Sequence, residues 1–309
     1  MADPDVTQPA APPTRAGFVA LIGATNAGKS TLINRLVGSK VAIVSHKVQT
    51  TRSTIRGIVM AAQTQIVFVD TPGIFQPKRR LDRAMVDTAW GGARDSDIVA
   101  LLVDAAAGID EGVRNTIRRL ADIRLPKVLV LNKIDAIARD RLLGLAAEAN
   151  ALGTFDATFM LSALNGDGVD DFVTYLETRL PEGPWLYPED EISDVPLRQL
   201  AAEITREKVF ERLHQELPYQ TTVETDEWRE QKDGSARVQQ TIFVERDSQK
   251  KIVIGAGGAT IKAISMASRK EIAALAEVPV HLFLFVKVRE NWADDPERYR
   301  VMGIDFPKD

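Results

Sequence analysis

The chain has 309 residues, 45% of them hydrophobic and 27% charged, which is typical of a globular protein long enough for two domains. It contains no cysteine, so disulfides, thiolate nucleophiles and cysteine-ligated zinc are excluded. The formal net charge of −4 does not favour a nucleic-acid binder, although global charge says little about a local basic stripe. The three histidines, His46, His214 and His281, are scattered along the sequence, and we assign them no catalytic role.

The opening segment, residues 1–16, is rich in Pro, Ala and polar residues and lacks an apolar run of signal-peptide length. We expect it to be a disordered tail. No apolar run elsewhere approaches the roughly 20 residues needed to cross a bilayer. The sequence therefore predicts a cytoplasmic protein that is soluble or at most peripheral to a membrane.

From residue 17 to about 180, strand-like apolar runs alternate with helical patterns. This alternation predicts an α/β domain with a mostly parallel sheet and helices on both faces. The runs TIRGIVMA (54–61) and QIVFVD (65–70) are expected to form an antiparallel pair. Four short polar strings follow strand-like runs, at the carboxyl ends where such sheets bind ligands.

The first string, GATNAGKS (23–30), has the Gly-x-x-x-x-Gly-Lys-Ser spacing of a P-loop and lies between a strand-like and a helical pattern. Backbone N–H groups and a helix N-terminus would cradle phosphates here. Lys29 would lie along the β- and γ-phosphates, and the Ser30 hydroxyl would bind Mg²⁺. The predicted phosphate-binding residues are Gly23, Ala24, Thr25, Asn26, Ala27, Gly28, Lys29, Ser30 and Thr31.

The second string is DTPG (70–73), which comprises Asp70, Thr71, Pro72 and Gly73. Asp70 would bind Mg²⁺ directly or through water, and the N–H of Gly73 could approach a γ-phosphate because no Cβ is in the way. The intervening segment SHKVQTTRSTIRG (45–57) lies where a switch I segment is expected. Either Thr50 or Thr51 would bind Mg²⁺ when GTP is bound, and the sequence does not choose between them.

The third and fourth strings, NKID (132–135) and SA (162–163), predict the base specificity. The two oxygens of Asp135 match the two adjacent donors of guanine, whereas adenine would present an acceptor to them. The stem of Lys133 would pack on the base, Asn132 would tie loops together, and the Ala163 N–H would face the guanine O6. Ser162 and Leu164 belong to the same predicted loop.

Hydrolysis of GTP to GDP and phosphate is expected to be slow, because Ile74 follows DTPG where Ras-like proteins carry a water-orienting glutamine. Asn26 could help to hold a monovalent cation, K⁺, against the phosphates in place of an arginine finger, or it could simply cap its own loop. The candidate catalytic residues are Lys29, Asn26, Thr50, Thr51 and Gly73.

Residues 181–196 hold four prolines and five acidic residues with no Lys or Arg, which is typical of a linker. Beyond it, we expect a small α+β module with a helix over 197–218, a hairpin around KDGS (232–235), a helix near 258–276 and a strand over 280–288. In this module an apolar turn, IVI (252–254), leads into a Gly-x-x-Gly loop.

The loop comprises Gly255, Ala256, Gly257 and Gly258. A Gly-x-x-Gly loop of this kind clamps a single-stranded nucleic-acid backbone in KH domains. The basic residues around it would make such binding salt-sensitive. Those we assign to RNA binding are Lys250, Lys251, Lys262, Arg269 and Lys270. The alternative is a glycine-rich turn beside an ordinary solvated basic face.

Taken together with QTTR (49–52), PKRRL after DTPG, AAEITREK, ELPY, IVIGAGGATIK and EVPVHLFLFVKVRENWADD, these motifs resemble those of the Era family of bacterial GTPases. The resemblance covers nearly the whole chain after the tail. It implies a Ras-like P-loop GTPase domain over 17–180 and a type II KH domain with a C-terminal tail over 197–309.

The resemblance also implies binding to the 3′ end of 16S ribosomal RNA, a role in maturation of the small ribosomal subunit, and peripheral association with the inner membrane. We expect a monomer. Two positions depart from the family pattern: Thr25 replaces the usual proline, and the pair Ala256-Gly257 lacks the basic residue often found there. A nucleotide-dependent membrane or protein-interaction switch without specific RNA binding is the alternative function.

Overall fold

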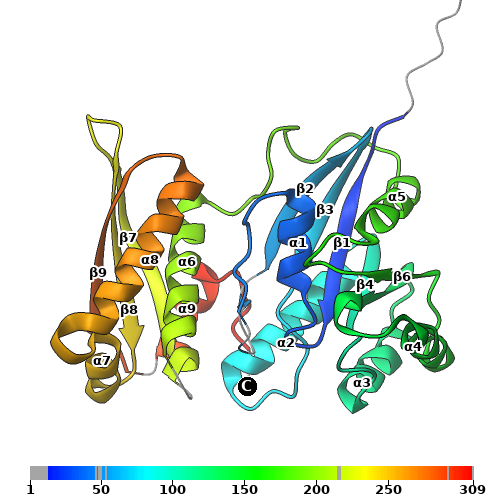
Figure 1. Cartoon of the computed structure of the whole chain (residues 1–309), viewed down its shortest axis with the longest axis horizontal. Coiled ribbons are helices and arrows are strands. Elements are labelled where there is room, and N and C mark those ends of the chain that lie inside the picture. The colour runs from blue at the N-terminus through cyan, green and yellow to red at the C-terminus, as the bar shows by residue number, and fades with distance from the viewer. Residues whose placement is uncertain are drawn as a thin grey trace, which may run out of the picture.

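The computed structural model describes residues 13–45, 47, 51–52, 54–213, 217–290 and 292–307. It consists of two α/β modules that lie side by side (Figure 1). We call residues 13–180 the N-terminal module and residues 197–290 the C-terminal module. The first twelve residues, most of the expected tail, lie outside the described ranges, and the first strand begins at Arg15, two residues inside that expected tail.

The N-terminal module is built on a six-stranded sheet in the order β2-β3-β1-β4-β5-β6. Its strands are β1 (Arg15–Gly23), β2 (Ile55–Ala61), β3 (Thr64–Asp70), β4 (Ile98–Asp104), β5 (Lys127–Asn132) and β6 (Ala157–Leu161). Neighbouring strands are parallel except β2, which pairs antiparallel with β3, as the sequence predicted. The carboxyl ends of the five parallel strands therefore meet at one edge of the sheet.

Both faces of this sheet are covered by helices, because alternate residues of the buried strands point to opposite sides. From β1, Val19 and Leu21 pack in a core cluster with helices α1 (Lys29–Val37) and α5 (Val169–Arg179). From the same strand, Ala20 and Ile22 pack in a second cluster on the opposite face. That cluster takes in helices α2 (Arg80–Arg94), α3 (Glu111–Leu120) and α4 (Arg139–Leu152).

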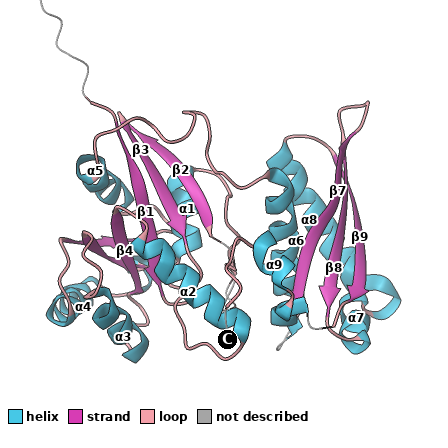
Figure 2. Ribbon diagram, turned by 180° about the vertical axis from the view of Figure 1, so that it is seen from behind, coloured by secondary structure: helices cyan, strands magenta, loops and turns pink. Residues whose placement is uncertain are grey.

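The C-terminal module has a three-stranded sheet in the order β7-β8-β9, with helices on one side of it (Figure 2). Its elements are α6 (Leu197–Arg212), β7 (Thr221–Glu230), β8 (Ala236–Val244), α7 (Asp247–Ile254), α8 (Ala259–Ala276) and β9 (Val280–Val288). β8 is antiparallel to β7 and parallel to β9. The expected hairpin, second helix and last strand are present. The first helix ends at Arg212 rather than 218, and the expected apolar turn is the end of helix α7.

The segment expected as a linker, 181–196, runs along the outer strand of the N-terminal sheet. The Ile58 N–H donates to the Ile192 carbonyl at 2.9 Å, and the Ser193 hydroxyl donates to the Arg56 carbonyl at 2.7 Å. The buried Gln65 amide oxygen accepts the N–H groups of Leu186 and Tyr187. This segment is therefore fastened to the first module before α6 begins.

The C-terminal segment returns to the N-terminal module and ends beside α2 (Figure 2). It contains the short helix α9 (Pro296–Val301), and its side chains Trp292, Tyr299 and Ile304 share a buried cluster with Leu81 and Met85 of α2. The sequence predicts only a tail here. The segment instead forms part of the interface between the modules. Within the described ranges, no helix combines the length and apolar character required to cross a bilayer.

Candidate nucleotide site

A cavity of about 690 Å³ lies at the carboxyl edge of the N-terminal sheet. This volume falls within the range of small-molecule sites. The predicted site residues that line it are thirteen: Thr25, Asn26, Gly28, Lys29, Ser30, Thr31, Thr51, Gly73, Asn132, Lys133, Asp135, Ala163 and Leu164. Four strings far apart in sequence thus converge on one site.

The P-loop places Lys29 at the first position of α1, with its side chain buried. Its Nζ donates to the carbonyls of Gly23 at 3.1 Å and Ala24 at 3.0 Å. Burial lowers the pKa of Lys29 to about 8, an effect that the negative charge of Asp70 opposes. A buried ammonium beside a helix N-terminus is an arrangement suited to polyphosphate.

Gly28 is required at its position for two reasons. Its φ of 96° lies in the left-handed region, and an added Cβ would stand 2.2 Å from the Asn132 Nδ2 atom. The same Nδ2 donates to the Ala27 carbonyl at 2.8 Å, so Asn132 ties the P-loop to the end of β5, as predicted from the sequence. Close packing of these two loops therefore depends on a glycine.

Three oxygen-bearing side chains gather at the predicted Mg²⁺ position. The Ser30 hydroxyl donates to Asp70 Oδ2 at 2.7 Å, and the Thr51 Oγ1 lies 3.0 Å from Ser30 Oγ and 3.4 Å from Asp70 Oδ2. Among the described residues, the buried Asp70 Oδ1 has no hydrogen-bond partner. Burial raises the pKa of Asp70, and Lys29 opposes that rise. This set of hard oxygen donors fits Mg²⁺.

Of the two neighbouring threonines, Thr51 lies at this oxygen cluster. Thr50 is outside the described residues, as is His46. No group of three His, Asp or Glu side chains forms a metal site elsewhere in the part of the chain that is described. A site with one carboxylate and two hydroxyls leaves room for phosphate oxygens and water, which is how Mg²⁺ is usually held.

The DTPG loop lies directly against the P-loop. Thr71 is buried and donates to the Leu21 carbonyl at 2.9 Å, and the Ile74 N–H donates to the Gly23 carbonyl at 2.9 Å. A Cβ on Gly73 would lie 2.7 Å from Thr25 Cγ2. The Ile74 side chain packs against the cluster under α2. An apolar side chain at this position has no polar group with which to orient a water.

The base end of the cavity is held by a hydrogen-bond network. Asp135 accepts the Ser162 hydroxyl, and Lys133 Nζ pairs with Asp104 Oδ2 at 2.6 Å. The Ala163 N–H, which we expected to face the guanine O6, instead donates to Asn132 Oδ1 at 2.9 Å. A contact of this N–H with the guanine O6 therefore stays a prediction.

Sequence reasoning missed four residues that line the cavity: Ile43, Val44, Ser45 and Asp104. Asp104 ends a strand-like run, IVALLVD, and that position was an available signal. Ile43 and Val44 belong to no motif, and Ser45 begins the segment expected as switch I. The two residues before them, Val41 and Ala42, are held by Asn34 of α1, whose Oδ1 accepts both of their N–H groups at 2.9 Å.

In the C-terminal module, the predicted Gly-x-x-Gly loop connects α7 to α8. Gly255, Gly257 and Gly258 all have positive φ, and Ala256 and Gly257 are exposed. Lys262, Arg269 and Lys270 are exposed on α8, where their spacing puts them on one helix face. Lys251 is exposed and Lys250 half-buried on α7. The apolar side chains Ile252 and Met266 are also exposed, at 56% and 59%.

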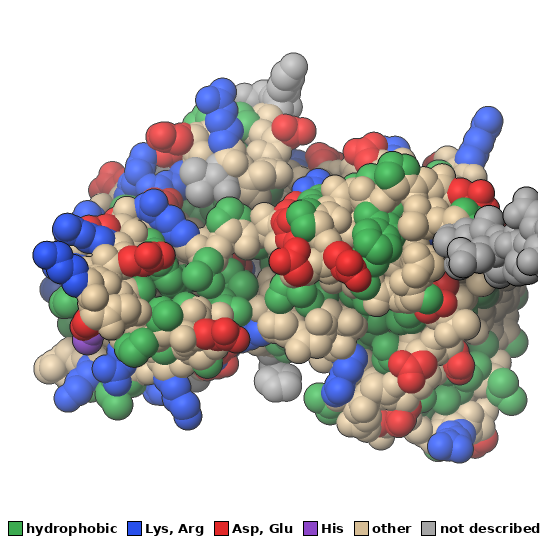
Figure 3. Space-filling model, turned by 90° about the horizontal axis from the view of Figure 1, so that it is seen from above, with side chains coloured by type: hydrophobic (Ala, Val, Ile, Leu, Met, Phe, Trp, Pro, Cys, Tyr) green, Lys and Arg blue, Asp and Glu red, His purple; other side chains and the backbone are tan. Residues whose placement is uncertain are grey.

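Basic side chains are concentrated locally despite the net charge of −4. Seen from above, Lys and Arg gather at the outer end of the C-terminal module (Figure 3). A narrow loop of small residues between two helices, with cations and apolar side chains beside it, is suited to single-stranded nucleic acid.

Family models match both modules. The model described as a 50S ribosome-binding GTPase matches residues 18–133, and the model of the KH domain matches residues 216–293. Among curated proteins, GTPase Era of Sinorhizobium medicae is 67% identical over 302 residues, covering 98% of this chain and 97% of the relative. GTPase Era of Brucella suis is 64% identical over 294 residues, covering 95% and 94%.

Two solved structures have the same fold over nearly the whole chain, each with a TM-score of 0.89 and 35% identity, covering 94% of this chain and 99% of the other. One is Era in complex with MgGDPNP and nucleotides 1506–1542 of 16S ribosomal RNA. The other is a variant of Aquifex aeolicus Era bound to GDP and aluminium fluoride. With relatives this similar along its whole length, the chain belongs to the Era family of GTPases.

Proposed function

We propose that this protein is a GTP-dependent switch that binds the 3′ end of 16S ribosomal RNA and assists biogenesis of the small ribosomal subunit. One observation carries the proposal: a cavity lined by the P-loop, DTPG and NKID strings and an exposed Gly-x-x-Gly loop occur in one chain. The 35% identical Era structure with MgGDPNP and a 16S RNA segment supports both halves. The membrane or protein-interaction alternative has no comparable support.

In the GTPase domain, the ammonium of Lys29 and the N–H groups at the start of α1 bind the β- and γ-phosphates. Ser30, Asp70 and Thr51 hold Mg²⁺, which neutralises charge on the phosphate oxygens. We assign Thr51 rather than Thr50 because its hydroxyl lies 3.0 Å from Ser30 Oγ. The Gly73 N–H donates a hydrogen bond to the γ-phosphate, so GTP orders this loop and hydrolysis releases it.

Guanine is selected by Asp135, whose carboxylate is oriented by Ser162. Lys133 is held over the base position by its ion pair with Asp104. Since Asn132 occupies the Ala163 N–H, the base contact from this loop depends on other backbone groups or on a shift of Asn132.

Hydrolysis proceeds by attack of water on the γ-phosphate, and no glutamine follows DTPG to orient that water. We propose K⁺, bound near Asn26, as the second cation. Asn26 has a left-handed φ of 63° and lines the cavity. If K⁺ acts there, hydrolysis is faster in K⁺ than in Na⁺, and an Asn26→Ala variant loses the difference. Equal rates in the two salts would remove K⁺ from the proposal.

In the KH domain, the loop Gly255–Gly258 and the cations Lys250, Lys251, Lys262, Arg269 and Lys270 contact the RNA backbone. The loop itself carries no basic side chain, so its N–H groups and the flanking lysines supply the phosphate contacts. We further propose that the protein acts as a monomer in the cytoplasm. Peripheral contact with the inner membrane rests on the family resemblance alone.

The test is binding of the purified chain to an RNA oligonucleotide from the 3′ end of 16S ribosomal RNA. Binding is measured with a non-hydrolysable GTP analogue and with GDP, each at two salt concentrations. We expect tighter binding in the GTP-like state, and weaker binding at higher salt because phosphate contacts release counterions. No binding in either state would overturn the RNA half of the proposal and leave a GTPase. Binding that persists in high salt would favour an apolar partner surface.

A further inference from the structure

We propose that the KH domain forms part of the GTPase site: Glu207 and the anchored Arg52 are positioning residues that hold Thr51 and Val44 at the nucleotide. This inference rests on the proposed function. It concerns the segment between α1 and β2, whose described residues from Lys40 to Arg52 we call the switch segment. Its residues Val44 and Thr51 line the nucleotide cavity, and its residues Lys40 and Arg52 contact the KH domain.

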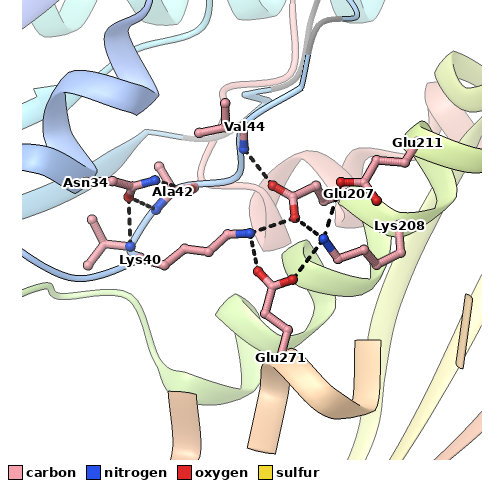
Figure 4. A network of polar contacts seen from close by, with 9 residues as sticks. Asn34, Lys40, Ala42, Val44, Glu207, Lys208, Glu211 and Glu271 are labelled. Carbon is pink, nitrogen blue, oxygen red and sulfur yellow. Dashed lines mark hydrogen bonds and ion pairs between the residues drawn. The ribbon is translucent and has the colours of Figure 1, made fainter. Parts of the chain in front are cut away.

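The first contact is a buried ion-pair network around Glu207 of α6 (Figure 4). Glu207 Oε1 accepts the backbone N–H of Val44 at 2.8 Å, and Oε2 accepts Lys40 Nζ at 2.6 Å. Lys208 Nζ lies 2.8 Å from Glu207 and 2.8 Å from Glu271 of α8, and Lys40 also pairs with Glu271. The Glu207 side chain is only 3% exposed.

The network holds two lysines and three glutamates, since Glu211 also pairs with Lys208 at 3.3 Å. Glu207 is the most buried of these carboxylates, so neutralising it removes a partner that both lysines share inside the interface. The network joins Lys40 and Val44 of the switch segment to residues of two KH helices. Val44 itself lines the nucleotide cavity, so one peptide group links the cavity wall to the KH domain.

The second contact lies at the end of α6. Lys47 Nζ donates to the carbonyls of Phe210 and Leu213, at the carboxyl end of that helix. A cation at this end is favoured by the helix dipole and by carbonyls that lack intrahelical partners. The middle of the switch segment is therefore fastened to the KH domain as well.

The third contact is Arg52, which is 5% exposed and inserts into the KH side of the interface. Its guanidinium donates to the carbonyls of Thr221 at 2.8 Å and Tyr219 at 3.0 Å. It lies over the rings of Phe210 and Trp292, with 5.9 Å and 5.4 Å from its central carbon to the ring centroids. Forked donation combined with stacking fixes a guanidinium more tightly than an ammonium.

Arg52 directly follows Thr51, and adjacent Cα atoms are held about 3.8 Å apart by a trans peptide. The side chain of Thr51 reaches the Ser30–Asp70 oxygens while that of Arg52 is anchored in the KH domain. The position of the Mg²⁺ threonine is thus tied to the position of the KH domain. By reciprocity, a ligand that shifts the KH anchor alters GTP binding, and GTP alters the anchor.

The experiment uses the full chain and compares Arg52→Met with Arg56→Met. Arg56 is a matched control because it lies on β2 nearby and pairs with Asp194 of the 181–196 segment at 2.6 Å. Three quantities are measured: the single-turnover rate of GTP hydrolysis, its dependence on Mg²⁺ concentration, and the affinities for a non-hydrolysable GTP analogue and for GDP.

We expect Arg52→Met to lower the single-turnover rate and the analogue-to-GDP affinity ratio about tenfold each, and to raise the half-saturating Mg²⁺ concentration, because a misplaced ligand loses its contribution. GDP affinity should change by less than about twofold, since GDP lacks the γ-phosphate that the switch segment meets. Arg56→Met should match the parent protein in all three.

A second pair of variants keeps the test decisive if Arg52→Met misfolds. Glu207→Gln keeps an acceptor for Val44 but removes the charge, and Glu111→Gln removes the charge of a carboxylate that pairs with Arg118 of its own helix, α3. We expect Glu207→Gln to move the same quantities in the same direction by about two- to fivefold, as expected for weakened positioning, and Glu111→Gln to leave them unchanged.

Parental rates and Mg²⁺ dependence in both Arg52→Met and Glu207→Gln would overturn the inference, even if both variants melted at lower temperature. In that case the contacts would stabilise the interface between the domains without positioning the residues at the nucleotide. If Arg52→Met loses GDP affinity as well, it is misfolded and Glu207→Gln decides. Failure of the proposed function is distinguishable, because the parent chain would then neither hydrolyse GTP nor bind the RNA.

Discussion

The Ser162 hydroxyl donates a hydrogen bond to the Asp135 carboxylate, joining two loops that are 27 residues apart in the chain. The bond orients a carboxylate that lines the base end of the cavity, and the Asn165 N–H donates in turn to Ser162 Oγ at 3.1 Å. The base-reading group is thus held in place before nucleotide arrives. Orientation of this kind favours specificity because little ordering remains to be done on binding.

Replacement of Asp135 by Asn is therefore expected to abolish guanine preference. Asn presents one donor and one acceptor, so one of the two guanine donors faces another donor. Loss of charge-assisted hydrogen bonds of about 1.5–3 kcal/mol each implies GTP affinity reduced by roughly 10- to 100-fold or more. Competition binding with GTP, ATP and XTP measures this. Xanthine carries a carbonyl where guanine has its amine, so XTP should bind the variant better than GTP does. Unchanged GTP affinity would remove Asp135 from the base site.

Nucleotide affinity is expected to depend on pH through Lys29. Burial lowers the pKa of this residue to about 8 from 10.5, so the ligand-free ammonium loses its proton as pH rises past 8. Polyphosphate binds the charged form, and GDP affinity should therefore be level below pH 8 and fall above it, by up to about tenfold per pH unit. A Lys29→Arg variant stays protonated and should show no such fall, whatever its absolute affinity. A parent profile that is flat to pH 9.5 would contradict the assignment.

The same pKa shift affects stability without nucleotide. Between pH 8 and 10.5 the unfolded chain binds more protons at Lys29 than the folded chain does. The contribution of this group to the free energy of unfolding is therefore fully present above 10.5 and is lost as pH falls to about 8. Without nucleotide, burial favours the neutral form of Lys29. Bound nucleotide favours the charged form instead, because the phosphates are negative.

A methyl group at position 73 is expected to impair hydrolysis. The Cβ of Gly73→Ala would lie 2.7 Å from Thr25 Cγ2 and 2.9 Å from Thr25 N and Cα, and backbone atoms of the P-loop cannot yield cheaply. We expect a single-turnover rate at least about tenfold lower, because the γ-phosphate contact is displaced. Gly91→Ala on α2 is the control, since nothing lies within 4 Å of its added Cβ. A Gly73→Ala rate equal to that of the control would show that the two loops separate without cost.

A site residue could be predicted from the sequence when its role depends on a short local string, and not when it depends on residues far away in the chain. Lys29, Ser30 and Asp135 were predicted correctly as cavity or Mg²⁺-cluster residues because their local strings fix both residue type and strand-end position. The hydrogen bond from the Ala163 N–H to Asn132, 31 residues away, could not be predicted, because it depends on how two distant loops pack. The hydrogen-bond partners of Arg52 could not be predicted, since they lie 166 to 169 residues further along and are backbone carbonyls, which leave no sequence pattern.

The short helices show a second limit. The apolar residues of α7 read as a turn because only eight residues form the helix and Gly255 follows directly. The buried Trp292 and Tyr299 gave the end of the chain an apolar character without a helical period long enough to recognise. These side chains pack against α2, which is about 200 residues earlier in the chain, so their role could be recognised only in the folded structure.

Position 257 offers a direct test of the KH loop. Gly257 has a φ of 57° and nothing within 4 Å of an added Cβ, so Asp and Asn, which tolerate this conformation better than other residues, fit equally well there. Gly257→Asp places a negative charge where a phosphate is expected and should weaken binding of the 16S oligonucleotide about tenfold or more. Gly257→Asn has nearly the same shape without the charge and should stay within about threefold of the parent, since neutral backbone contacts contribute less. Both should hydrolyse GTP at the parental rate.

The comparison of these two variants separates charge from shape, which a single variant cannot do. If Asp and Asn weaken RNA binding equally, the loop requires bare backbone for steric reasons, because Gly-x-x-Gly loops admit the sugar-phosphate closely. If neither weakens it, the RNA backbone does not pass this loop, and the basic side chains of α7 and α8 would have to supply the phosphate contacts without the loop. Fluorescence anisotropy at low and high salt distinguishes the cases, because only the loss of a phosphate contact reduces the salt dependence of binding.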